Sequence, residues 1–319
     1  MSRAFVFPGQ GSQTVGMGKA LADAFAPARA VFAEVDDALG QKLSQIIFEG
    51  PAEDLTLTAN TQPALMAVSL ATIRVLEAEA GLDLGKHARF VAGHSLGEYS
   101  ALAAAGALSI ADTARLLRIR GDAMQKAVPV GEGAMAALLG LEFEQAAEIA
   151  RDAAQGEVCD PANDNGGGQV VVSGTKAAVE RAVALATERG AKRAVMLPVS
   201  APFHCALMAP AADAMREALA GATINAPIVP VIANVAAGPI SDPEAIRDAL
   251  VQQVTGTVRW RESVAFMADQ GVTAFFEIGA GKVLTGLAKR IASGTSGQAV
   301  GMPEDIEKVR QALQGAASP

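Results

Sequence analysis

Short β-rich runs alternate with longer stretches rich in alanine and leucine, and this alternation is the feature that most restricts the fold of the chain. Strands that alternate with helices form a parallel sheet with helices packed on its faces. Four runs are predicted as core strands, each followed by a turn rich in Gly, Pro, Ser or Asn: residues 5–7, 90–92, 229–233 and 274–278. The fold class is therefore α/β, and we expect functional residues at the ends of these strands.

The middle of the chain has a different order of elements. We predict strand, helix, strand, turn, strand, helix and strand at residues 134–141, 144–154, 157–163, 165–168, 169–173, 177–189 and 192–197. This βαββαβ order is that of a ferredoxin-like unit. The sequence thus predicts a large α/β domain of residues 1–129 and 200–319 and an inserted ferredoxin-like α+β small domain of residues 130–199, with a possible cleft at their seam. We expect residues 294–301 and a following helix over 304–313 to be peripheral.

Composition and charge exclude several classes of protein. Of the 319 residues, 50% are hydrophobic, which is enough for a sizeable core. The net charge of −8 argues against an extended nucleic-acid surface, since phosphate binding requires clustered Lys and Arg. We find no apolar run long enough to span a membrane and no signal peptide, so we expect a cytoplasmic location. Cys159 and Cys205 are the only cysteines and indicate neither a disulfide framework nor a zinc site.

The strongest functional signal is the segment FVAGHSLGEYSAL at residues 90–102, which is an apolar strand, then G-x-S-x-G, then an alanine-rich helix. Gly93 and Gly97 permit a sharp strand-to-helix turn that exposes the Ser95 hydroxyl at the start of the helix. The Leu96 N–H in the first helical turn is then a candidate donor to an oxyanion. A glycine-bounded turn with Ser95 as a helix cap is the alternative, but the strand before it and the helix after it favour a nucleophile.

A serine nucleophile needs a base, and the chain offers three histidines. His87 lies in a polar segment, and His94 adjoins Ser95 in the tight turn, where neighbouring side chains diverge. His204 follows the last strand of the small domain on a proline-restricted loop and is the favoured base. The group that orients it stays open: an acid at a strand end, such as Glu277, or a backbone carbonyl.

Arg120 lies on the apolar face of a predicted helix over residues 111–126. Its face neighbours three and four residues away are Leu116, Leu117, Ala123 and Met124, so the guanidinium is expected to point inward. A buried guanidinium needs an anion and matches a carboxylate in a bidentate pair. The partner is either a structural Asp or Glu, or a carboxylate that arrives with the substrate.

Four motifs together resemble one family, the malonyl-CoA:acyl carrier protein transacylases of fatty acid synthesis and the related acyltransferase domains of polyketide synthases. They are FPGQGSQ at residues 7–13, GHSLGEY at 93–99, Arg120-Gly121 with Met124-Gln125, and HCALM at 204–208. The resemblance covers nearly the whole chain. It implies a hydrolase-like large domain with a ferredoxin-like insert, in agreement with the domain organisation predicted above.

The resemblance also implies the reaction and its participants. Ser95 would be the nucleophile, His204 the base, and Arg120 the clamp for the malonyl carboxylate. Malonyl-CoA would acylate Ser95, and the phosphopantetheine thiol of acyl carrier protein would then attack the malonyl ester in a ping-pong reaction. No metal or bound organic cofactor is needed. Malonyl-CoA and acyl carrier protein are thus the expected partners, and we expect a monomer.

The resemblance also suggests roles for three further positions. Gln10 matches the second oxyanion-hole position beside the Leu96 N–H. Gln253 matches the residue whose main-chain carbonyl orients the base. Phe203 stands immediately before His204, where many transacylases have Ser; in polyketide acyltransferases a Phe here resembles the malonyl-selective form, although one methyl group is worth only about 1–3 kcal/mol in a pocket.

Two other functions compete with acyl transfer. A serine hydrolase can use the same elbow, but a lipase pocket would not place the Arg120 cation beside its acyl chain. A carrier-binding module without activity would require Ser95, His204 and Arg120 all to be incidental. The carrier can belong to fatty acid or polyketide synthesis, and a chain of this length without a linker to other modules favours the former.

Two weaker patterns have simpler explanations. Residues 279–282 read GAGK between a strand and a helix, but the spacing is not that of a P-loop. Several basic residues could form a docking patch for an acidic carrier or lie on solvated faces: Lys192, Arg193, Arg259, Arg261, Lys282, Lys289 and Arg290.

Overall fold

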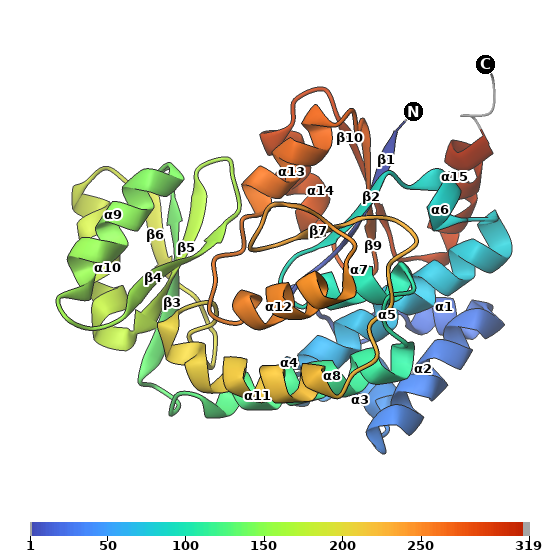
Figure 1. Ribbon diagram of the computed structural model, residues 1–319, viewed down its shortest axis with the longest axis horizontal. Helices are drawn as coiled ribbons and strands as arrows, with labels where there is room; N and C mark the ends of the chain where they lie inside the picture. The colour runs from blue at the N-terminus through green and yellow to red at the C-terminus, as the bar shows by residue number, and fades with distance from the viewer. Residues whose placement is uncertain (1, 315–319) are drawn as a thin grey trace.

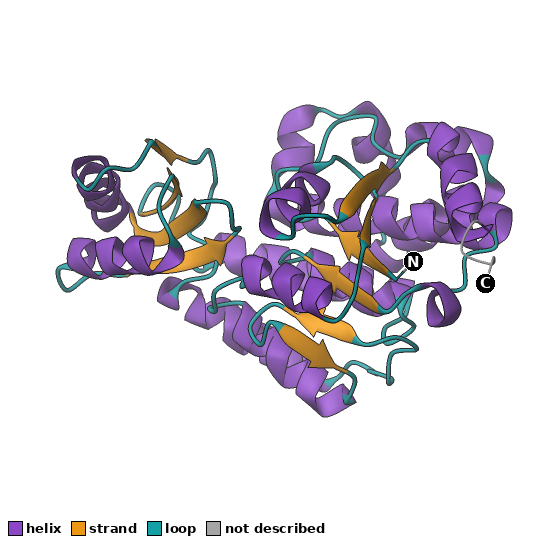
Figure 2. Cartoon of the chain, turned by 90° about the horizontal axis from the view of Figure 1, so that it is seen from above, coloured by secondary structure: helices purple, strands orange, loops and turns teal. Residues whose placement is uncertain are grey.

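The computed structural model describes residues 2–314, which form two units of unequal size (Figure 1). The larger unit has a six-stranded sheet with helices on both faces, and the smaller one has a four-stranded sheet of its own (Figure 2). No helix within residues 2–314 combines the length and the apolar character that crossing a membrane requires.

The six-stranded sheet contains all four core strands predicted from the sequence. Its strand order is β10-β9-β1-β2-β7-β8, and every neighbouring pair is parallel except β7 and β8. The bounds are β1 (Arg3–Phe7), β2 (Phe90–Gly93), β7 (Val231–Ala233), β8 (Gly238–Ile240), β9 (Ala274–Ile278) and β10 (Ser296–Val300). The prediction for residues 294–301 was incomplete: this polar segment is the edge strand β10, followed by α15 (Pro303–Gln314).

Strand β1 lies in the middle of this sheet and is buried on both faces. Phe5 and Phe7 pack into a core with the helices of one face, whereas Ala4 and Val6 point into a second core that includes Trp260. Successive side chains of a strand point to opposite faces, so one short apolar run supplies both cores. This central position fixes the loop after Phe7 at the carboxyl edge of the sheet, next to the end of β2.

Helices cover both faces of the large sheet (Figure 2). They are α1 (Lys19–Ala24), α2 (Ala26–Leu39), α3 (Leu43–Glu49), α4 (Ala52–Thr56), α5 (Thr58–Ala80), α6 (Leu84–His87), α7 (Gly97–Ala104), α8 (Ile110–Lys126), α11 (Ala209–Ala220), α12 (Pro243–Gln253), α13 (Trp260–Asp269) and α14 (Val283–Ile291), with a 3₁₀ turn η1 (Ala206–Met208). Most of α5 is buried, and it packs against α2 and α8.

The smaller unit has the element order predicted from the sequence. Its elements are β3 (Gly133–Leu139), α9 (Phe143–Ala154), β4 (Cys159–Asp164), β5 (Gln169–Thr175), α10 (Lys176–Glu188) and β6 (Arg193–Met196). The strands pair antiparallel in the order β4-β5-β3-β6, and both helices pack on this sheet around a separate apolar core. Every predicted boundary lies within two residues of the observed one, because strong hydrophobic periodicity and Gly-rich turns mark each element.

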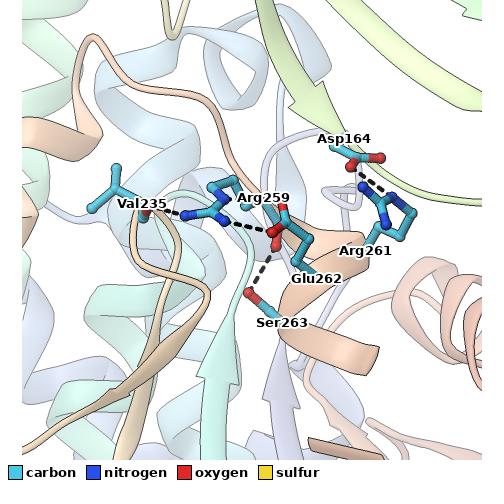
Figure 3. Close-up of polar contacts among 6 residues, drawn as sticks. All are labelled: Asp164, Val235, Arg259, Arg261, Glu262 and Ser263. Atoms are coloured by element: carbon cyan, nitrogen blue, oxygen red, sulfur yellow. Dashed lines mark hydrogen bonds and ion pairs between the residues drawn. The ribbon is translucent and has the colours of Figure 1, made fainter. Parts of the chain in front are cut away.

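The two units are joined where β4 meets the segment before α13. Asn163 forms an isolated parallel bridge with Val258, and the Asp164 N–H donates to the Val258 carbonyl over 3.0 Å. Arg261 donates from Nε to the buried Asp164 carboxylate over 2.8 Å, and Arg259 bonds Glu262 (Figure 3). Arg259 and Arg261 are therefore engaged in ion pairs at this seam.

Close packing between α5 and α8 gives a stability prediction. A Cβ added to Gly121 on α8 would lie 2.6 Å from the Ala59 Cα and 2.7 Å from the Thr58 carbonyl oxygen, which belong to the backbone of α5. Overpacking against a backbone that cannot yield costs about 1–3 kcal/mol, so Gly121→Ala should lower the free energy of unfolding by that amount in urea titrations.

Gly286→Ala on the exposed face of α14 is the matched control. A Cβ there meets nothing within 4 Å, so the substitution should raise the free energy of unfolding by about 0.5–1 kcal/mol through helix propensity. Equal effects of the two substitutions would contradict the packing argument.

Candidate active site

Ser95 occupies a sharp turn between β2 and α7 with a left-handed backbone, φ 54°. A Cβ on Gly93 would lie 1.9 Å from the Gly97 carbonyl group, and one on Gly97 would lie 2.3 Å from the Phe7 carbonyl oxygen. Only glycine fits at either position, because a backbone atom blocks each Cβ. The G-x-S-x-G spacing is thus a steric requirement of this turn, and the turn directs the Ser95 hydroxyl toward a cavity.

The structure brings Ser95 and His204 together from segments 109 residues apart. Ser95 Oγ lies 2.7 Å from His204 Nε2, and His204 Nδ1 lies 2.8 Å from the main-chain carbonyl oxygen of Gln253. A carbonyl only accepts, so the neutral imidazole places its proton on Nδ1 and leaves Nε2 free to accept the serine proton. His204 also has a left-handed backbone, φ 58°.

Burial is the main reason that His204 is uncharged at neutral pH. It lowers the pKa of His204 to about 3, and the positive charge of Arg120 acts in the same direction. A base must be unprotonated before it can accept a proton, so the burial keeps His204 in the competent form over a wide range of pH.

Glu277, the acid considered as an orienting group, lies elsewhere. Its carboxylate accepts hydrogen bonds from the backbone N–H groups of Leu284 and Thr285, 3.0 and 2.8 Å away, at the start of α14. It therefore caps a helix. The other two histidines are also engaged: His94 Nε2 lies 2.9 Å from Asn165 Oδ1, and His87 Nδ1 accepts from the Asp83 N–H.

Leu96 and Gln10 line the cavity together with Ser95. Leu96 precedes the first turn of α7, and Gln10 follows β1, whose neighbour in the sheet is β2. Within residues 2–314, neither of their backbone N–H groups donates to another protein group. The Gln10 side chain donates to Thr58 Oγ1 over 3.4 Å. Two free backbone donors beside a nucleophile are the usual composition of an oxyanion hole.

Arg120 points into the site from α8, as its face neighbours predict, and is 1% exposed. Its guanidinium donates to Gln62 Oε1 and to Gln253 Oε1, each over 2.8 Å, and to Ser95 Oγ over 3.2 Å. Within residues 2–314 it thus bonds only neutral oxygen atoms, and its Nε has no partner. A buried cation held by amides can bind an anionic ligand without first breaking an ion pair.

A cavity of about 420 Å³ lies in front of these groups, at the seam of the two units. The larger unit supplies Ser95, Arg120 and His204, and the smaller unit supplies Met135 and Asn163. Other apolar lining comes from Met124, Leu197, Val199 and Phe203. The site is therefore a mainly apolar pocket with one cation and one nucleophile at its base, a size and composition suited to a small anionic acyl group.

Asn234 is a residue of the site that the sequence-based analysis missed. Its Oδ1 accepts the Ser95 N–H over 2.7 Å, and its Nδ2 donates to the Gly93 carbonyl over 2.7 Å. Asn234 follows the predicted strand 229–233 directly. The general expectation of functional residues at strand ends was the signal that could have selected it.

Together, the doubly wound sheet, the serine on a strand-to-helix elbow and the adjacent neutral histidine define an α/β enzyme that works through an ester on its serine. Comparison with known families makes this more specific. A family model described as the acyl transferase domain matches residues 4–312, and the chain belongs to this family of acyltransferases.

Relatives and solved structures agree with this assignment. The malonyl CoA-acyl carrier protein transacylase of Escherichia coli K12 is 51% identical over 300 residues, which are 94% of this chain and 96% of the relative. The crystal structure of an acyl-carrier-protein-S-malonyltransferase from Bartonella henselae is 62% identical, with a TM-score of 0.96 over 98% of this chain and 100% of that one. A malonyl-transacylase in complex with a type II PKS acyl-carrier protein is 46% identical, with a TM-score of 0.93 over 99% of this chain and 100% of that one.

The low pKa of His204 predicts an unusual pH profile for the reactivity of Ser95. Protonated His204 cannot accept the Ser95 proton. Because the pKa of His204 is lowered, this loss of activity is expected only at acidic pH. The rate constant for labelling by a serine-directed fluorophosphonate, followed by intact mass, should therefore stay within about threefold between pH 8 and pH 5.

A histidine with the ordinary pKa of 6.5 would instead lose about 30-fold of its unprotonated form by pH 5. Ser95→Ala supplies the unlabelled baseline. A labelling rate that halves near pH 6.5 would contradict the buried, neutral state of His204.

Proposed function

We propose that this acyltransferase transfers a malonyl group from malonyl-CoA to the phosphopantetheine thiol of acyl carrier protein through a malonyl-Ser95 intermediate, and so supplies fatty acid biosynthesis. The names of the similar proteins support the donor and the acceptor. The observation that carries the proposal is the Arg120 guanidinium, which is buried, forms no ion pair with another residue of 2–314, and lies 3.2 Å from Ser95 Oγ. It offers a bidentate site for the free carboxylate of a malonyl group.

The reaction proceeds in two half-reactions with balanced proton transfers. His204 accepts the Ser95 proton, Ser95 Oγ attacks the thioester carbonyl, and the C–S bond breaks as His204 returns the proton to the CoA sulfur. The carrier thiol then gives its proton to His204 and attacks the ester carbonyl. The C–O bond to Ser95 breaks, and the serine oxygen recovers the proton.

Preorganised dipoles support both half-reactions. In our assignment the backbone N–H groups of Leu96 and Gln10 stabilise the oxyanion of each tetrahedral intermediate. The Gln253 carbonyl orients His204 and stabilises the imidazolium that forms when the base accepts a proton. Phe203, 8% exposed on the cavity wall, narrows the space beside the acyl group and disfavours an α-methyl substituent.

We further propose that residues 1–129 and 200–319 form the large hydrolase-like domain, with residues 130–199 as an inserted ferredoxin-like domain. The β4-β5-β3-β6 order with two helices supports this division, as does the cavity at the seam. We assign the enzyme to the cytoplasm. The unpaired state of Cys159 and Cys205, both buried, agrees with a reducing compartment.

Incubation with malonyl-CoA in the absence of carrier tests the proposal directly. Intact mass should show one malonyl adduct on the wild type and none on Ser95→Ala, because the ester has no other acceptor in the mechanism. Release of free malonate without an adduct would instead favour a hydrolase, and unchanged malonyl-CoA would refute the donor.

Replacement of Arg120 tests the carboxylate clamp. Arg120→Ala should lower the rate constant for acylation by malonyl-CoA about 100-fold relative to acylation by acetyl-CoA, since a charge-assisted bidentate pair contributes about 1.5–3 kcal/mol. Dividing the rate constant for malonyl-CoA by that for acetyl-CoA cancels any general effect of the substitution on Ser95 or His204.

Arg118→Ala is the control on the same helix. Arg118 donates to Asn60 and Gln41, so its loss should leave the ratio of the two donors unchanged. A malonyl-to-acetyl ratio that is the same in Arg120→Ala as in the wild type would reject the clamp.

A further inference from the structure

The hydrogen bonds around the Ser95 turn converge on one buried carboxyl group. We propose that Glu98 is a positioning residue that holds the nucleophile and, through Gln253, the base and the arginine in their reactive arrangement. The inference rests on the proposed roles of Ser95 and His204.

Glu98 Oε2 accepts two hydrogen bonds, from Gln253 Nε2 over 2.8 Å and from the Asn234 backbone N–H over 3.0 Å. The same two residues hold the Ser95 peptide groups. Asn234 Oδ1 accepts the Ser95 N–H over 2.7 Å, and Gln253 Nε2 donates to the Ser95 carbonyl over 3.0 Å. Glu98 therefore anchors both supports of a turn whose backbone is left-handed.

The orientation of the Gln253 amide follows from its neighbours. Glu98 Oε2 accepts whether the group is ionised or carries its proton on the unpartnered Oε1, and Arg120 can only donate, so the amide must point its nitrogen to Glu98 and its oxygen to Arg120. A reversed amide would face a donor with its nitrogen and an acceptor with its oxygen. The orientation that Glu98 enforces is also the one that supplies the hydrogen bond to the Ser95 carbonyl.

Burial of the Glu98 carboxyl group lowers the stability of the fold. Its side chain is 1% exposed, its Oε1 has no hydrogen-bond partner within residues 2–314, and burial raises its pKa to about 7. Arg120 is the cation that acts on it, and it does so across Gln253. A buried acid with one unpartnered oxygen contributes little to stability, whereas its other oxygen fixes two residues of the site.

The test compares Glu98→Ala, Glu98→Gln and the control Glu277→Ala. Glu277 is likewise a buried carboxylate that accepts two N–H groups, but it lies at α14, outside the site. For each protein we would measure the fluorophosphonate labelling rate of Ser95, the acylation rate at saturating malonyl-CoA, the half-saturating concentration and the melting temperature.

We expect Glu98→Ala to lower the labelling rate and the maximal acylation rate about 100-fold, because small displacements of reacting groups have effects of this size. The half-saturating concentration should change less than about threefold, since Arg120 keeps its bond to Gln62. Glu98→Gln retains an acceptor oxygen and should recover at least about tenfold of the loss. Glu277→Ala should lower the melting temperature and leave both rates unchanged.

Wild-type rates in Glu98→Ala would overturn the proposal, as would a Glu98→Gln protein as slow as Glu98→Ala. If Glu98→Ala does not fold, Glu98→Gln decides: rates within about tenfold of the wild type support the acceptor role, and a larger loss rejects it. The probe does not depend on malonyl-CoA. A wild type that is labelled at Ser95 but not malonylated would therefore refute the proposed function while the labelling rates still decide the role of Glu98.

Discussion

The left-handed backbone at Ser95 is the constraint on which the rest of the site depends. A non-glycine residue in this region costs about 1–2 kcal/mol and persists only where the surroundings fix it. Here Gly93 and Gly97 remove the steric obstacles, and the side chains of Asn234 and Gln253 bind the two peptide groups of Ser95. Because β1 and β2 are paired in register, the turn is held on a rigid sheet edge beside the loop that carries Gln10.

The second organising feature is a buried positive charge that forms no ion pair within residues 2–314. Burial lowers the pKa of Arg120, and three neutral oxygens partly replace its water. The same charge disfavours protonation of His204. One cation thus reinforces the effect of burial that keeps the base neutral and, in our assignment, binds the carboxylate of the substrate. Arrival of that carboxylate would neutralise Arg120 and so make the imidazolium of the acylation step easier to form.

Much of this arrangement could be predicted from the sequence, for identifiable reasons. Buried strands and Gly-rich turns give strong local patterns, and the spacing around Ser95 is a steric necessity. The face of Arg120 follows from helical periodicity. Hydrophobic periodicity could not reveal strand β10. In this edge strand only Val300 is fully buried, and the other residues are polar or small. Asn234 and Glu98 escaped as site residues because their roles come from contacts 136 to 155 residues away in sequence.

The two units contribute different parts of the site. Every group that transfers or stabilises charge in our assignment belongs to the larger unit, and the smaller one contributes an apolar wall through Met135. The smaller unit is fastened by the Asn163–Val258 bridge and the Asp164–Arg261 ion pair, both on the β4 side. These contacts join the wall to the unit that carries Ser95. Changes in its side chains can alter which acyl group fits, while the hydrogen bonds that position the serine and the histidine stay as they are.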